Sequence, residues 1–117
     1  MSAADKRPPD SAELRGLREE IDALDRRIVQ LLNDRATLTV AVGHEKSRLG
    51  RRAIRDAQRE REVLLRVSIA NEGPLPQVDL LAIYRRLIAS ARALEARERA
   101  RAAGRDDGDG DGEPPSA

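Results

Sequence analysis

The sequence contains no cysteine, phenylalanine or tryptophan, and it has one tyrosine, one histidine and one methionine. The absence of cysteine excludes disulfide bonds and thiolate chemistry. The scarcity of aromatic rings leaves Leu, Ile, Val and Ala to build the core, and it removes the side chains that stack on nucleic-acid bases. We therefore expect no nucleic-acid partner. The lone His44 has no Cys, His or carboxylate cluster that would suggest a metal site.

Long hydrophobic runs are also missing. No run approaches the ~20 apolar residues of a membrane-spanning helix, and the opening MSAADKRPPD has no apolar stretch. We therefore expect a cytoplasmic protein with no membrane partner. Residues 1–10 are predicted to form a flexible leader, and residues 104–117, GRDDGDGDGEPPSA, a disordered acidic tail. One domain, residues 11–103, remains between them.

The chain is rich in charge, with 37% of its 117 residues being Asp, Glu, Lys or Arg, and its apolar residues recur at helical spacing. This pattern predicts an all-α fold of three helices with a long first helix. Asp10 and Glu13 form the expected capping box of the first helix, and Gly73 is expected to cap the end of the second. Such thin helices bury little surface alone, so we expect association to complete the core. The predicted helices span 10–48, then 54 or 56 to 71 or 72, then 76–103.

An apolar stripe along the first helix is interrupted by a charge. Arg35 stands where the alternating steps of three and four require another Leu. Burying an unpaired guanidinium is costly, so Arg35 should meet an anionic partner from the protein or from a ligand. The apolar positions of this stripe are Leu14, Leu17, Ile21, Leu24, Ile28, Leu31, Leu38 and Val42.

Two further cations of the same helix, Arg18 and Lys46, face the same side as Arg35. At a rise of about 1.5 Å per residue, Arg35 and Lys46 lie roughly 16 Å apart along the axis, so their long side chains can converge on a small molecule. Arg18 is roughly 25 Å from Arg35 and cannot join them. If one site uses all three, Arg18 must come from a second copy, whose antiparallel first helix would bring it there.

Charges also occupy one face or inward positions of the other two helices. Asp56, Arg59 and Glu60 share one face at the start of the second helix, because they are spaced i, i+3, i+4. On the third helix, Ala91 and Glu95 continue the apolar line of Tyr84 and Ile88, so Glu95 is expected to face inward. Taken singly, such charges are more often structural or solvated. Several of them around a small core favour a binding site.

Three motifs carry a resemblance to a known family. They are LRxxIDxLDxxIxxLLxxR from Leu17 to Arg35, VGxxK from Val42 to Lys46, and RDxxRE from Arg55 to Glu60. In this order and spacing they resemble the all-helical class of chorismate mutases, over about residues 13–98. The resemblance implies an intertwined homodimeric helical bundle. It also implies two active sites, each built from both chains, that act on a small dicarboxylate substrate without a metal or other cofactor.

The resemblance implies roles for the cations. Arg35 and Arg18, the latter from the partner chain, correspond to arginines that bind the substrate carboxylates, and Arg59 matches a further cation of the site. Lys46 matches the lysine that contacts the ether oxygen and a carboxylate. Planar guanidinium groups suit the carboxylates, and an ammonium suits an oxygen that gains negative charge.

The acidic residues follow the family in part. Asp56 and Glu60 correspond to the acidic pair near the C4 hydroxyl of the substrate. The family usually has Ser and Gln where this chain has Ala91 and Glu95. An ionised Glu95 would repel the charge that develops on the ether oxygen, so we expect Glu95 to act in its protonated form, favoured by burial.

The expected reaction is the Claisen rearrangement of chorismate to prephenate in aromatic amino acid biosynthesis, which makes the chain an isomerase. Such a rearrangement needs neither proton transfer nor a nucleophile, in keeping with a chain that is poor in histidine and lacks cysteine. One alternative is a 4-amino-4-deoxychorismate mutase that gives 4-amino-4-deoxyprephenate, since a C4 ammonium would suit nearby carboxylates. Another alternative is a catalytically silent helical dimerisation or regulatory module.

Overall fold

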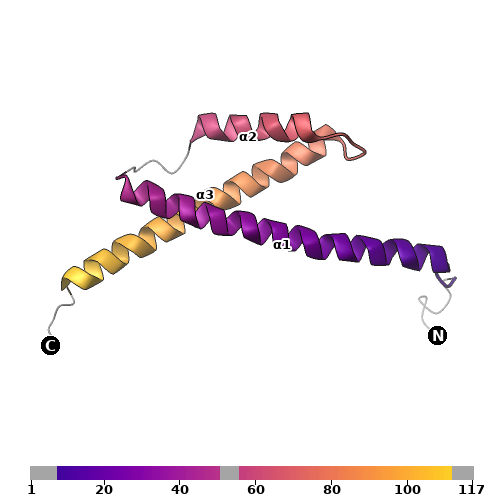
Figure 1. The fold of residues 1–117 in the computed structure, drawn as a ribbon, viewed down its shortest axis with the longest axis horizontal. Coiled ribbons are helices and arrows are strands. Elements are labelled where there is room, and N and C mark those ends of the chain that lie inside the picture. The colour runs from indigo at the N-terminus through magenta and orange to yellow at the C-terminus, as the bar shows by residue number, and fades with distance from the viewer. Residues whose placement is uncertain (1–7, 51–55, 112–117) are drawn as a thin grey trace. The chain divides into compact units, whose positions relative to one another are not determined.

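The computed structural model describes residues 8–50 and 56–111, with side chains described as far as Arg105. In this part of the chain three helices and no strands follow one another: α1 (Ala12–Arg48), α2 (Ala57–Ala70) and α3 (Gln77–Asp111) (Figure 1). The prediction of an all-α fold with a long first helix is therefore confirmed. Among the described helices, none has the length and apolarity that crossing a bilayer would require.

The first turn of α1 is capped by Ser11, and not by the predicted box of Asp10 and Glu13. Ser11 Oγ accepts a hydrogen bond from the Leu14 backbone N–H at 3.0 Å, and its carbonyl accepts the next N–H along the helix. Serine and aspartate are equally good capping residues, so adjacent candidates compete for the same position. The helix consequently starts one residue later than the box predicted.

The chain divides into two compact units, residues 1–35 and 36–117. In the first unit the apolar stripe of α1 is largely uncovered. Its middle residues, Leu17, Ile21, Leu24, Ile28 and Leu31, each keep more than half of their surface exposed. A continuous apolar face of this kind marks an interaction surface in a folded protein.

The second unit holds the packed part of the structure. Here α2 packs against α3, and Ile88 of α3 is only 8% exposed. Half-buried apolar residues of both helices face this contact, while Leu65 and Ile69 on the other side of α2 are exposed. The half-buried residues are Val63, Leu64 and Val67 of α2 and Leu80, Leu81, Tyr84 and Leu87 of α3.

The turn between α2 and α3 is organised by Asn71 and Gly73. Asn71 caps α2, and its Oδ1 accepts a hydrogen bond from the Gly73 N–H at 3.0 Å. Its Nδ2 donates to Gln77 Oε1 at 2.7 Å, at the start of α3. Gly73 was predicted to be the cap, but it lies two residues beyond the Asn71 cap, where its φ of +75° favours glycine. The side chain of Asn71 thus bridges the two helix ends.

Helix α3 is longer than the sequence predicted. It passes through Gly104 and continues to Asp111, whereas helical structure was expected to fade by Ala103. The preceding residues are mostly Ala, Arg and Glu, which are strong helix formers and carry the helix past its packed part. The first residues of the predicted leader and the last of the predicted tail, 1–7 and 112–117, lie outside the described residues.

Candidate active site

Lys46 and Glu95 form an ion pair between the end of α1 and the middle of α3. Lys46 Nζ donates a hydrogen bond to Glu95 Oε1 at 2.9 Å, and only 14% and 13% of the two side chains are exposed. The prediction that Glu95 faces inward is therefore confirmed. The helices approach closely here because Gly43, one turn before Lys46, is buried against the backbone of Glu95. Removing Lys46 would leave the poorly solvated Glu95 carboxylate without this cation.

Asp56 and Arg59 lie at the start of α2, as the sequence predicted. Asp56 is the N-cap, and its Oδ1 accepts a hydrogen bond from the Arg59 backbone N–H at 3.0 Å. The Arg59 side chain is 57% exposed, and its Nη1 lies 3.9 Å from Glu62 Oε2. An exposed pair at that distance restrains a side chain weakly. Asp56 is thus fixed by the helix start, while the Arg59 guanidinium is accessible.

Glu60 faces α3, where it meets a cation that the sequence analysis did not select. Glu60 Oε2 lies 3.7 Å from Arg92 Nε, and the two side chains are 17% and 34% exposed. Arg92 follows Ile88 by four residues and adjoins Ala91, which is half-buried. The spacing of four residues after Ile88 was therefore enough to predict that Arg92 lies on the same inward face of α3 as Ile88.

A second contact between α1 and α3 lies one turn beyond Glu95. A hydrogen bond of 3.1 Å joins His44 Nε2 and Glu98 Oε1, and Arg101 Nη1 donates to Glu98 Oε2 at 2.9 Å. Glu98 is 8% exposed. The hydrogen bond from His44 holds the pKa of Glu98 below its usual value; burial opposes this, while Arg101 and Arg105 reinforce it. This contact stabilises the helix crossing beside the Lys46–Glu95 pair.

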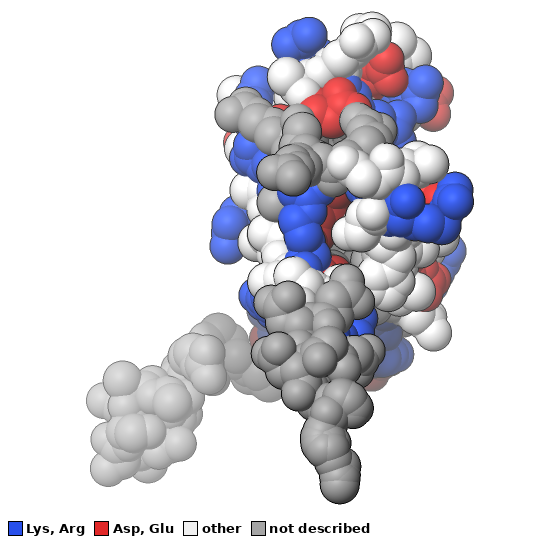
Figure 2. Space-filling model, turned by 90° about the vertical axis from the view of Figure 1, so that its left-hand side faces the viewer, with Lys and Arg blue, Asp and Glu red and all other residues white. Residues whose placement is uncertain are grey.

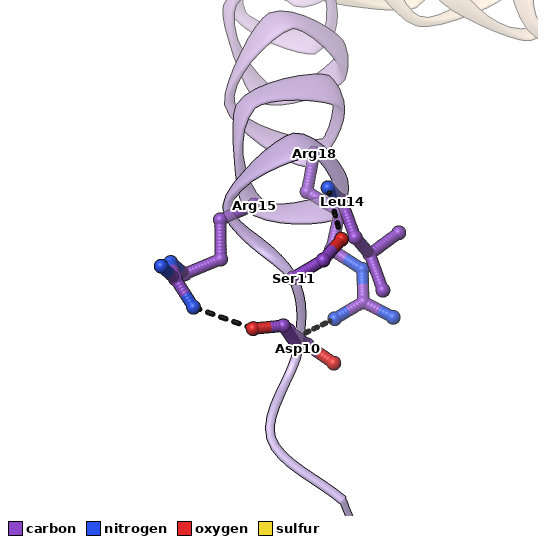
Figure 3. Close-up of polar contacts among 5 residues, drawn as sticks. All are labelled: Asp10, Ser11, Leu14, Arg15 and Arg18. Atoms are coloured by element: carbon purple, nitrogen blue, oxygen red, sulfur yellow. Dashed lines mark hydrogen bonds and ion pairs between the residues drawn. The ribbon is translucent and has the colours of Figure 1, made fainter.

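The two remaining predicted cations, Arg18 and Arg35, belong to the first unit. Arg18 Nη1 pairs with the Asp10 carboxylate, and Arg15 Nη1 donates to the Asp10 carbonyl oxygen at 2.6 Å (Figure 3). The Arg18 side chain is 59% exposed, whereas Arg35 is half-buried. The pairing restrains Asp10, the residue before the Ser11 cap of α1, and the Arg18 guanidinium stays at the surface.

Both signs of charge are present on the face drawn in Figure 2. Lys and Arg side chains alternate there with Asp and Glu side chains and with uncharged surface.

Comparison with known proteins agrees with this all-helical arrangement. The family model for chorismate mutase type II matches residues 17–96. A bifunctional chorismate mutase/prephenate dehydratase from Aquifex aeolicus (strain VF5) is 39% identical over 87 residues, which are 71% of this chain and 24% of that protein. The corresponding bifunctional protein from Neisseria gonorrhoeae (strain ATCC 700825 / FA 1090) is 36% identical over 78 residues, 67% of this chain and 21% of that protein.

A solved structure extends the comparison to the fold. Chorismate mutase (form II) from Thermus thermophilus superposes with a TM-score of 0.69 at 29% identity, covering 73% of this chain and 96% of that one. The present chain spans about a quarter of the length of the bifunctional relatives, but nearly all of the Thermus protein is matched. From the family model, the sequence identity and the fold together, the chain belongs to the chorismate mutase type II family.

Proposed function

We propose that this chain converts chorismate to prephenate in aromatic amino acid biosynthesis. The observation that carries the proposal, beside family membership, is the Lys46 ammonium held between α1 and α3 with 14% of its side chain exposed. In such a poorly solvated place a fixed positive charge interacts strongly with an oxygen that gains negative charge. Stabilising this negative charge is the electrostatic contribution that the rearrangement requires from the protein.

The proposed mechanism needs no proton transfer. Within one chorismate molecule the ether C–O bond breaks while a C–C bond forms, so the protein has to hold the compact conformer and stabilise the ether oxygen. Lys46 donates to that oxygen. Arg35 of one subunit and the partner subunit's Arg18 bind the two carboxylates of the substrate. The planar guanidinium group can donate two parallel hydrogen bonds to a carboxylate. Arg59, whose guanidinium is accessible, adds a further cation.

The C4 hydroxyl of the substrate is assigned to the acidic residues of α2. Asp56, the N-cap, and Glu60, in the first turn, both lie at the start of α2, and each carboxylate can accept a hydrogen bond. Asp56 is already oriented by its capping bond to the Arg59 N–H at 3.0 Å. We assign no polar role to Ala91, which lines the substrate pocket with its methyl group where the family usually has a serine hydroxyl.

Glu95 is proposed to act as a neutral hydrogen-bond donor to the ether oxygen. Its Oε1 accepts from Lys46 Nζ at 2.9 Å. The proposal therefore requires that Glu95 is already protonated in the enzyme that binds the substrate, since an ionised carboxylate would repel the developing charge. Gln at this position would donate without a proton.

The pH–rate profiles of wild type and Glu95→Gln test this role. Between about pH 5 and pH 8 the wild-type kcat/KM is expected to depend on pH if Glu95 donates as a neutral carboxyl. The Glu95→Gln profile is expected to stay flat over the same range. If both profiles are flat, Glu95 does not act as a protonated donor.

Homodimerisation is part of the proposal. The exposed stripe from Leu17 to Leu31 in the first unit requires apolar cover, and in an isologous pair the same stripe is buried in both copies. The distance along α1 between Arg18 and Lys46, roughly 42 Å for a straight helix, also requires that one site take these two cations from different copies. The two active sites of the dimer would then be shared.

Assaying purified protein separately with chorismate and with 4-amino-4-deoxychorismate tests the function directly. We expect turnover of chorismate to prephenate with the higher kcat/KM. Preference for the amino compound would instead assign the chain to 4-amino-4-deoxyprephenate formation. Turnover of neither compound would favour a catalytically silent helical module.

A further inference from the structure

Two carboxylates of the described helices face inward beside a fixed cation. Glu95 lies against Lys46 of α1, and Glu60 of α2 lies against Arg92 of α3, with 3.7 Å between Oε2 and Nε. Arg92 and Glu95 are three residues apart and therefore adjacent on one face of α3. At both positions a carboxylate that could attract a cationic ligand already has a cation of the protein beside it.

The placement of Arg92 bears on the choice between a hydroxyl and an ammonium at C4 of the substrate. Glu60 without a counterion would favour an ammonium, because a carboxylate that is 17% exposed gains from any opposite charge nearby. The Arg92 guanidinium beside Glu60 weakens the attraction between Glu60 and a C4 ammonium. Arg92 would also repel the ammonium directly. A hydroxyl loses little, since it needs only a hydrogen-bond acceptor.

We propose that Arg92 is a specificity-determining residue, which selects a neutral C4 substituent by neutralising the charge of Glu60. The inference rests on the proposed function, because it assumes that Glu60 faces C4 of the substrate. Arg92 acts through Glu60 and need not touch the substrate itself. Arg92 is thus the residue that disfavours the 4-amino compound.

The test compares kcat/KM for chorismate and for 4-amino-4-deoxychorismate in wild type, Arg92→Met and Arg92→Lys. Met keeps the length of the side chain without its charge, and Lys keeps the charge. We expect Arg92→Met to raise the ratio of amino to hydroxy activity by about two- to fivefold, the range of a partly exposed ion pair. Arg92→Lys should keep the wild-type ratio.

The ratio separates specificity from a merely structural role. If Arg92 only joined α2 to α3, its loss would lower both activities together and leave the ratio unchanged, which would overturn the inference. Arg86→Met, which removes an exposed arginine of the same helix, is the matched control and should also leave the ratio unchanged. Wild-type protein that turns over neither compound would refute the proposed function, and this inference with it. An active wild type with an unchanged Arg92→Met ratio would refute this inference alone.

Discussion

Replacing Lys46 with methionine is expected to lower kcat/KM for chorismate by about 10²- to 10³-fold, the usual cost of removing one donor to a developing oxyanion. Methionine fills a similar volume but cannot donate to the ether oxygen. Steady-state kinetics on the purified variant measure the loss. Circular dichroism shows whether the helices persist, since the substitution also leaves Glu95 without its cation.

A double variant separates the two consequences of losing Lys46. If the loss of activity arose from an unpaired Glu95 carboxylate, Lys46→Met/Glu95→Gln would recover most of it. We expect the double variant to stay close to Lys46→Met, because the missing donor limits the rate. Arg48→Met is the control: it removes an exposed cation that pairs with Glu45 in the same turn, and full activity is expected. A Lys46→Met enzyme with wild-type kcat/KM would contradict the proposed role.

Mixing two inactive variants is expected to restore about one quarter of wild-type activity. The variants are Arg18→Ala and Lys46→Met, combined in equal amounts under conditions that let subunits exchange. Half of the resulting dimers contain one chain of each kind, and each of these has one site in which both residues are intact. The recovery therefore follows from a site that takes Arg18 and Lys46 from different chains.

A same-chain double variant provides the control for this experiment. When Arg18→Ala/Lys46→Met is mixed with either single variant, no site holds both residues and no activity should return. The change in specific activity with time after mixing also measures the exchange of subunits. Failure of the two single variants to complement, with exchange demonstrated by mass spectrometry of tagged chains, would refute the shared site.

The sequence predicted those parts of the site that depend on which side of a single helix a residue occupies. The inward position of Glu95 follows from its spacing after Ile88, and the position of Asp56 at the start of α2 follows from its place before an apolar run. Both are properties of a single helix, so no knowledge of neighbouring helices was needed. The contacts of Glu60 with Arg92 and of His44 with Glu98 depend on where helices cross, which periodicity does not encode.

The errors at the helix ends have a related cause. Ser11 and Asp10 are both good caps, and Asn71 and Gly73 are both good terminators, so local preference leaves a shift of one or two residues open. Side-chain hydrogen bonds decide between them. Asn71 is the cap because its amide also reaches Gln77 across the turn, a contact that exists only once α3 has folded back.

The residues that give α3 its polar contacts favour catalysis at some cost in thermal stability. After Ile88 in the sequence, the inward face of α3 has Arg92, Glu95 and Glu98 at positions where an ordinary helical core would have leucine. Well-packed apolar residues in place of a buried ion pair often give an equally stable or more stable protein. Selection for heat resistance alone would therefore tend to erase Lys46 and Glu95, and a thermally improved descendant would keep the fold and lose its reaction.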